Sequence, residues 1–288
     1  MNKELTIVFS SYQSQHLLVK ILKQFYRKYK IIIIENSLDL KIKESLEKKF
    51  KGIEVVIPKK NLGLAKSYNL GIKKTKTKFI FLNNPDLEID DKSIKKLLSL
   101  AKKINKFGII SPTYKNESIY KNYEIFSPKK ENKSKIFQKF NVCEVDQIDN
   151  NFLVKRETVK KNLFDEKYFL YFETIDFATN LRNKGKKLYI SKKIKFHHFG
   201  NSLGPKYTNL IKKTRSFHFN WSKFYYYKKN FNFFYALKKI LPNFIKAIKK
   251  SFISLLKFDL RNFQFSILEI LGIITSILSI KSFYRPRN

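Results

Sequence analysis

Short apolar runs alternate with amphipathic stretches over the first hundred residues of the chain. The apolar runs have the length of β-strands and cover Leu5–Ser10, Ile31–Ile34, Ile53–Ile57 and Phe79–Leu82. The stretches that follow them place apolar residues at helical spacing, in Leu17–Tyr29, Leu40–Phe50, Ala65–Lys74 and Lys92–Ile104. A strict alternation of strand and helix predicts βαβ units, and therefore a parallel sheet that is covered by helices.

After about Phe107 the pattern changes to shorter strands. We expect strands at Gly108–Pro112, Ser118–Phe126, Asp149–Val154, Leu188–Ile190 and Ile194–Phe196, and an exposed lysine-rich loop at Lys129–Lys139. A helix from Asp176 to about Asn183 should end at Gly185, because glycine readily adopts the left-handed conformation found after helices. These elements predict an α/β domain that covers residues 1–204.

Residues 205–288 form a different segment, with 17 Lys and Arg but only 2 acidic residues. Between Leu237 and Leu256, apolar residues follow a spacing of three and four while lysines occupy the other positions. The pattern predicts a basic amphipathic helix that begins or bends at Pro242. Such a helix could lie on an anionic membrane surface, or pack on the first domain with its lysines in solvent. The apolar run Phe265–Ile280 is shorter than the ~20 residues of a spanning helix, so we expect a packed or interfacial helix there.

The formal net charge of +37 favours polyanionic partners, namely nucleic acid, anionic lipid or phosphorylated substrates. A coding bias toward Lys, Asn, Ile and Phe is a simpler explanation for part of this charge. We find no nucleic-acid-binding motif. The only cysteine, Cys143, excludes an intramolecular disulfide and suits a reducing compartment. The N-terminus shows none of the features of a signal peptide, so we expect a cytoplasmic protein.

A polar cluster follows each of the first four predicted strands. The clusters are Ser10-Ser11-Tyr12, Glu35-Asn36-Ser37, Asn61–Ala65 with Asn69, and Asn84-Pro85-Asp86. Parallel strands end at the same edge of a sheet, where ligands of open α/β sheets bind. Mg²⁺ and Mn²⁺ use one or two carboxylates together with substrate phosphates, and Asp86 could supply one of them. Together the clusters predict a metal and diphosphate site, although each alone could be an ordinary loop.

Two further groups of residues could carry chemistry. Glu173 and Asp176 follow the aromatic run Tyr168–Phe172 and share one helix face. A carboxylate beside aromatic walls can take a proton from a hydroxyl; the simpler alternative is an acid that the helix dipole favours. His197 and His198 follow a strand and are potential metal ligands, or else only a polar strand end.

In this order along the chain, the segments resemble glycosyltransferase family 2. The most specific ones are Asn61-Leu62-Gly63, Asn84-Pro85-Asp86, Phe164-Asp165-Glu166 and Tyr171-Phe172-Glu173, and the similarity covers about residues 5–230. It is closest to the rhamnosyltransferase-like branch, which works on bacterial surface polysaccharides. The resemblance implies a GT-A fold with a mixed sheet flanked by helices, a nucleotide-sugar donor, inversion at the anomeric carbon, and a glycan or lipid-linked acceptor.

The resemblance and the strand-end clusters together assign a role to each candidate residue. We assign donor binding to Ser11, Tyr12, Glu35, Asn36, Asn61, Gly63, Asn69 and Asn84. Glu35 would contact the base or ribose, at a position where the family usually has Asp. Asp86 and His197 would hold a divalent cation, Mg²⁺ or Mn²⁺, with Asn84 in the other place of the family's Asp-x-Asp.

One departure from the family pattern concerns the catalytic base. The family's usual Glu-Asp pair is Glu173-Thr174 in this chain, and threonine cannot act as the base. Either Glu173 or Asp176 would then be the base, or the protein would be a weak or inactive relative that works as a membrane-surface partner. A basic nucleic-acid-binding protein is a third alternative. For the enzyme we expect a peripheral position at the inner face of the cytoplasmic membrane.

Overall fold

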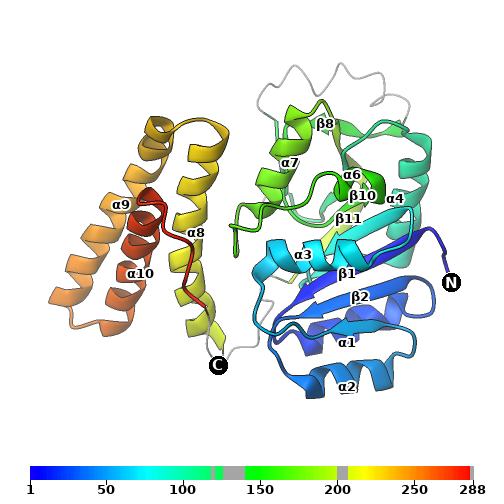
Figure 1. Ribbon diagram of the computed structural model, residues 1–288, viewed down its shortest axis with the longest axis horizontal. Coiled ribbons are helices and arrows are strands. Elements are labelled where there is room, and N and C mark those ends of the chain that lie inside the picture. The colour runs from blue at the N-terminus through cyan, green and yellow to red at the C-terminus, as the bar shows by residue number, and fades with distance from the viewer. Residues whose placement is uncertain (118–120, 126–139, 200–206, 286–288) are drawn as a thin grey trace. The chain divides into compact units, whose positions relative to one another are not determined.

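A computed structural model describes residues 1–117, 121–125, 140–199 and 207–285 (Figure 1). The chain forms two compact units. The first consists of residues 1–62, 66–164 and 177–202, and the second of residues 63–65, 165–176 and 203–288. The predicted loop 129–139 and the ends of the predicted strand 118–126 lie outside the described residues.

The first unit is built on a mixed sheet, which contains nine strands among the described residues, in the order β3-β2-β1-β4-β10-β6-β11-β5 with β8 also paired to β11. Its parallel part consists of β1 (Leu5–Ser11), β2 (Lys30–Glu35), β3 (Glu54–Val56) and β4 (Phe79–Asn83). The four isoleucines of β2 are fully buried, as expected of a strand that is covered on both faces. The predicted parallel layer is therefore confirmed.

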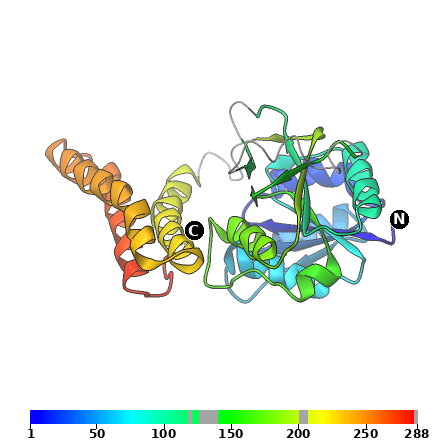
Figure 2. The same ribbon diagram turned by 90° about the horizontal axis from the view of Figure 1, so that it is seen from above.

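Helices connect the parallel strands and flank the sheet (Figures 1 and 2). They are α1 (Gln15–Phe25), α2 (Leu40–Lys49), α3 (Gly63–Lys74) and α4 (Asp91–Lys103). The side chains of Asp39 and Asp90 accept hydrogen bonds from backbone N–H groups in the first turns of α2 and α4. These caps satisfy donors that have no partner inside a helix, and so fix where the two helices begin.

The remaining strands make the sheet mixed, because β10 (Phe152–Lys155) runs antiparallel to both β4 and β6. The other elements of the first unit are β5 (Leu87–Glu88), β6 (Ile109–Tyr114), β7 (Tyr123–Glu124), β8 (Cys143–Val145), β9 (Gln147–Ile148), α6 (Arg156–Lys160) and β11 (Leu188–His198). Of these, β7 and β9 pair with each other in a separate sheet. The two strands predicted at 188–196 are one strand, β11, whose pairing with β6 shifts register between Ser191 and Lys195. Exposed Lys192 and Lys193 lie at this irregularity, which explains why the apolar pattern is interrupted.

The second unit contains three long helices, α8 (Thr208–Asn230), α9 (Phe233–Leu256) and α10 (Leu260–Ile277). The pattern analysis did not predict α8, although its buried Phe217, Trp221 and Phe224 have helical spacing. Of the two alternatives predicted for Pro242, a helix start is wrong, because Pro242 lies inside α9. The helix begins at Phe233, because the Asn232 side chain caps it by accepting from the backbone N–H of Tyr235 at 2.8 Å.

Helix α10 packs closely on α8 within the second unit. A side chain at Gly272 would clash with the backbone of Phe217, and the Ser276 hydroxyl donates to the carbonyl of Trp221 at 2.8 Å. By length and composition alone, α10 is also the one helix of the described residues that could cross a membrane, with a mean hydropathy of 1.2. A third of that window, 33%, is buried inside the protein.

A fully buried histidine lies in α8. The Nε2 atom of His218 is 2.7 Å from the carbonyl of Tyr284, and its Nδ1 atom is 2.9 Å from the hydroxyl of Ser282. Burial lowers the pKa of His218 to about 3, even though the hydrogen bond to the carbonyl of Tyr284 acts in the opposite direction. The imidazole is therefore neutral in the folded protein at neutral pH.

This histidine should make the second unit sensitive to acid. Because the folded pKa lies below the ordinary value of 6.5, its contribution to stability is complete above pH 6.5 and is lost as the pH falls toward 3. We expect a loss of about 2 kcal/mol in the free energy of unfolding between pH 7 and pH 5. Urea denaturation at both pH values measures it. His218→Gln should remove this part of the pH dependence, and an unchanged dependence in the variant would contradict the assignment.

Candidate functional site

The carboxyl ends of β1, β2 and β4 bring the polar residues that follow these strands to one edge of the first unit. Ser11 at the end of β1 is paired with Glu35 at the end of β2, and Phe9 is paired with Asn83 at the end of β4. The prediction that these strand ends meet is confirmed. Tyr12 and Asn61 are half-buried in the loops that follow β1 and β3.

Glu35 is fully buried at this edge, and only one of its carboxylate oxygens is used by the protein. Its Oε1 atom accepts from the backbone N–H groups of Gln13 at 3.2 Å and Ser37 at 2.9 Å. Among the described residues, its Oε2 atom and the buried hydroxyl oxygen of Ser11 have no hydrogen-bond partner. Buried polar atoms without partners are costly, so this pair fits a ligand that brings hydroxyl or N–H donors.

Two of the predicted donor-binding amides are instead engaged within the protein. The Asn36 amide donates to the Ser67 hydroxyl at 2.9 Å, and its oxygen accepts from the backbone N–H of Leu62, also at 2.9 Å. Asn69 makes two hydrogen bonds to the backbone of Phe164, at 3.0 and 2.9 Å. Both side chains are buried, so they fix the segments around α3 rather than present free amides to a ligand.

Gly63, at the start of α3, also has a structural reason for its identity. Its φ is +70°, and a Cβ atom there would clash with the backbone carbonyl of Phe169. The backbone N–H of the next residue, Leu64, donates to that same carbonyl at 2.8 Å. Glycine is therefore required by the close approach of the two backbone segments.

Asp86 lies beside a histidine, but the histidine is His198 and not the predicted His197. The Nε2 atom of His198 is 3.2 Å from Oδ2 of Asp86, and the backbone N–H of Phe199 donates to the Asp86 carbonyl at 2.9 Å. His197 is exposed and is paired with Glu88 of β5. Successive side chains of a strand point to opposite faces, so His197 and His198 cannot both face Asp86.

Asn84 does not act as a second acidic ligand. Its oxygen accepts from the Tyr68 hydroxyl at 2.7 Å, and its amide nitrogen donates to the Asn150 side chain at 3.3 Å. In the described part of the chain, no group of three or more His, Cys, Asp or Glu residues is arranged to hold a metal ion. Asp86 and His198 alone still fit Mg²⁺ or Mn²⁺, because these ions commonly take their remaining ligands from substrate phosphates and water.

In the second unit, Asp176 is almost completely buried and both of its carboxylate oxygens are engaged. Oδ2 accepts from the Lys229 amine at 2.6 Å, and Oδ1 accepts from the Asn230 amide at 2.8 Å. Lys229 also pairs with Asp165 at 2.8 Å. Burial would raise the pKa of Asp165, but the hydrogen bonds from Lys229, Lys167 and Tyr225 and the charge of Lys229 together outweigh it and lower that pKa. Asp176 therefore anchors the first turn of α7 (Glu173–Asn183) to α8, and both of its oxygens are already engaged.

Glu173 is the first residue of α7 and follows a strained backbone. Tyr171 and Phe172 have φ values of 68° and 64°, in the left-handed region that aromatic residues rarely occupy. Strain of this kind persists where the surrounding structure enforces it, and it is often found at functional sites. The Phe172 ring centroid lies 5.5 Å from those of Phe219 and Tyr226 in α8, so α8 supplies part of the predicted aromatic wall.

Residues 7–163 match the family model described as glycosyl transferase family 2. The chain belongs to this family. The search of curated proteins found no match. The family and the structural similarities described below support a glycosyltransferase, and the mixed sheet flanked by helices corresponds to the GT-A fold.

Several solved structures share the fold of this family 2 glycosyltransferase. The mannosyltransferase PcManGT from Pyrobaculum calidifontis, in complex with GDP-Man and Mn²⁺, is 10% identical with a TM-score of 0.57; the match covers 97% of this chain and 88% of that chain. GalNAc-T7 with UDP, GalNAc and Mn²⁺ is 15% identical with a TM-score of 0.55, over 78% of this chain and only 50% of that chain. Residues 1–349 of S. aureus TarS are 12% identical with a TM-score of 0.50, over 96% of this chain and 90% of that chain.

From the sequence, His198 was named only together with His197, to which the cation was assigned, and Lys229 was not named. His198 could have been chosen over His197, because it shares strand parity with Ile194 and Phe196, which are buried. Lys229 gave no comparable signal, since it is one of many lysines and its partners lie 53 and 64 residues away in the sequence.

Proposed function

We propose that this glycosyltransferase moves a sugar from a nucleotide-diphosphate donor to a hydroxyl of a glycan or lipid-linked acceptor, with inversion at the anomeric carbon. The observation that carries the proposal is the pair formed by Asp86 and His198 at the strand-end edge. Two structures of similar fold contain Mn²⁺ together with UDP and GalNAc or with GDP-Man, which supports a nucleotide-sugar donor and a divalent cation here.

On the donor side, Glu35 and Ser11 would bind the nucleoside through their buried oxygens, which have no partner among the described residues. Asp86 and His198 would hold Mg²⁺ or Mn²⁺, and this replaces the role first given to His197. When bound, the cation neutralises the charge that develops on the leaving diphosphate. Asn36, Asn69 and Gly63 then act by holding the surrounding backbone in place.

On the acceptor side, Glu173 would take the proton of the attacking hydroxyl. We favour Glu173 over Asp176 because both oxygens of Asp176 already accept hydrogen bonds from Asn230 and Lys229. Thr174, which occupies the position of the family's usual acid, is buried and has no carboxylate. One carboxylate would therefore perform the base chemistry.

We further propose a role in surface-polysaccharide synthesis at the inner face of the cytoplasmic membrane, with rhamnose as one candidate sugar from the resemblance to the rhamnosyltransferase-like branch. Thr174 favours a second candidate function, that of a catalytically weak relative that serves as a membrane-surface partner. The nucleic-acid-binding alternative is supported by the net charge alone, and the acidic strand ends Glu35 and Asp86 count against it.

A donor screen tests the proposed function. The purified protein is incubated with a panel of UDP-, GDP- and dTDP-sugars and Mg²⁺ or Mn²⁺, and mass spectrometry follows consumption of each donor with and without candidate acceptors. We expect consumption of one donor that stops on chelation of the cation. If no donor is consumed although the protein binds vesicles, the catalytically weak relative is the better description.

A further inference from the structure

The hairpin formed by α9 and α10 ends in a group of exposed apolar side chains, which we call the hairpin tip. Its most exposed members are Phe252, Leu256, Phe258 and Leu260, with exposed fractions of 62%, 65%, 88% and 73%. Phe258 also has a left-handed φ of 52°, an unfavourable conformation for an aromatic residue. A cluster of large exposed apolar residues marks a surface that meets another apolar phase or partner.

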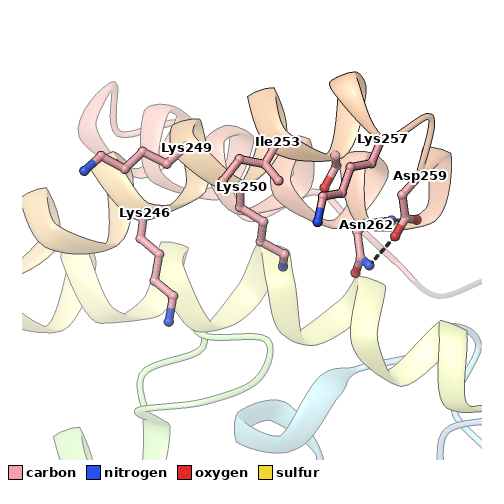
Figure 3. Close-up of a pocket in the computed structure, with 8 residues that line it drawn as sticks. Lys246, Lys249, Lys250, Ile253, Lys257, Asp259 and Asn262 are labelled. Carbon is pink, nitrogen blue, oxygen red and sulfur yellow. Dashed lines mark hydrogen bonds between the residues drawn. The ribbon is translucent and has the colours of Figure 1, made fainter.

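Beside the hairpin tip lies an open cavity of about 450 Å³ that is rich in lysine (Figure 3). Four lysines of α9 and the following turn line it, Lys246, Lys249, Lys250 and Lys257, together with Asp259 and Asn262 at the start of α10. A cavity of this size can hold a small polar group.

The positive charge around this cavity is only partly balanced by the protein. Lys250 pairs with Glu269 at 3.2 Å, whereas Lys246, Lys249 and Lys257 have no ion-pair partner among the described residues. The single acid in the wall, Asp259, accepts from the backbone and side chain of Asn262 at 3.0 and 2.6 Å, which engages both of its oxygens. Three lysines therefore remain available for an anion, and a phosphate is the kind of anion that lysine binds as a point charge.

We propose that this cavity binds the phosphate of an anionic phospholipid headgroup while the hairpin tip enters the bilayer. The exposed apolar residues beside the lysines favour a lipid headgroup over a soluble phosphate or a nucleic acid. A membrane surface offers negative headgroups directly above hydrocarbon, whereas a soluble phosphate or a nucleic acid would leave Phe258 and its neighbours in water. The inference deepens the membrane location proposed above, and it holds whichever sugar the enzyme transfers.

Vesicle binding by the full-length protein, measured without any donor, tests the inference. We expect the wild type to bind phosphatidylcholine vesicles that contain phosphatidylglycerol at least tenfold more tightly than vesicles of phosphatidylcholine alone. The triple variant Lys246→Gln, Lys249→Gln and Lys257→Gln should bind the anionic vesicles at least ~10-fold more weakly. Phe258→Ser should also weaken binding, with the lysines intact.

A matched control keeps the test specific. Lys41→Gln, Lys48→Gln and Lys51→Gln remove the same charge from exposed positions of the first unit, and should lower vesicle affinity by less than ~3-fold. An equal loss in both triple variants would show that vesicle binding depends on the net charge of the protein and not on the cavity, and would overturn the proposal. Binding of soluble glycerol 3-phosphate as tight as that of vesicles would overturn the membrane assignment. Circular dichroism confirms that each variant is folded, and a failed donor screen would leave these results unaffected.

Discussion

Asp86→Ala should lower sugar transfer by roughly a hundred- to thousandfold. Asp86 is the acidic side chain of the strand-end pair, and without it His198 is the one remaining protein ligand of the proposed cation. The charge on the leaving diphosphate would then develop with little compensation. The measurement is the release of nucleoside diphosphate at saturating donor, over a series of Mn²⁺ concentrations.

The two adjacent histidines provide a matched comparison for this prediction. We expect His198→Ala to reduce transfer by about 10- to 100-fold and to raise the Mn²⁺ concentration needed for half-maximal activity. His197→Ala should change activity by less than about threefold, because that side chain is exposed on the opposite face of β11. The reverse order of effects would show that His197 is the ligand and that the pairing of His198 with Asp86 is only structural.

Glu173→Gln should lower turnover by about a hundred- to ten-thousandfold while leaving the fold intact. Glutamine keeps the size and the hydrogen-bonding oxygen of Glu173 but cannot accept the acceptor's proton. Single-turnover transfer with the identified donor measures the loss. Calorimetry should show unchanged donor binding. This result would mean that the substitution affects the chemical step and does not damage the donor site.

Asp176→Asn should show the opposite result, a loss of stability with residual turnover. The substitution leaves Lys229 with one carboxylate in place of two, and we expect the free energy of unfolding to fall by roughly 1–3 kcal/mol. Urea denaturation measures this loss, and turnover is compared at a temperature where both variants are folded. If Asp176→Asn were fully stable but inactive while Glu173→Gln kept its turnover, the base would have to be Asp176.

The sequence was sufficient to predict the parallel half of the sheet, because each of its strands is a short and mostly apolar run that an amphipathic helical stretch follows. It was less informative for β11, where exposed Lys192 and Lys193 interrupt a strand that nevertheless continues. It also missed α8, whose aromatic residues are so frequent that no polar face stands out. A local sequence pattern identifies a helix or strand only when its buried positions are apolar and its exposed positions are polar.

For the candidate site, the sequence could predict which polar residues follow strands but not which of them remain available to a ligand. Glu35 and Asn36 both lie at the end of β2, yet the amide of Asn36 is engaged by Ser67, 31 residues later, while Glu35 keeps a buried oxygen that has no partner among the described residues. The choice between them depends on partners that are distant in the sequence, and no local pattern contains that information.

The ion pairs of Lys229 have a practical consequence for shortened forms of this enzyme. One amine holds both Asp165 and Asp176, and these two residues bracket the segment that leads into Glu173. A truncation that removes all of α8 would release both ends of this bracket and so disturb the proposed base. Any soluble version made by trimming the chain from its C-terminal end should therefore retain the helix through Asn230, and loss of activity in a shorter form would say nothing about membrane attachment.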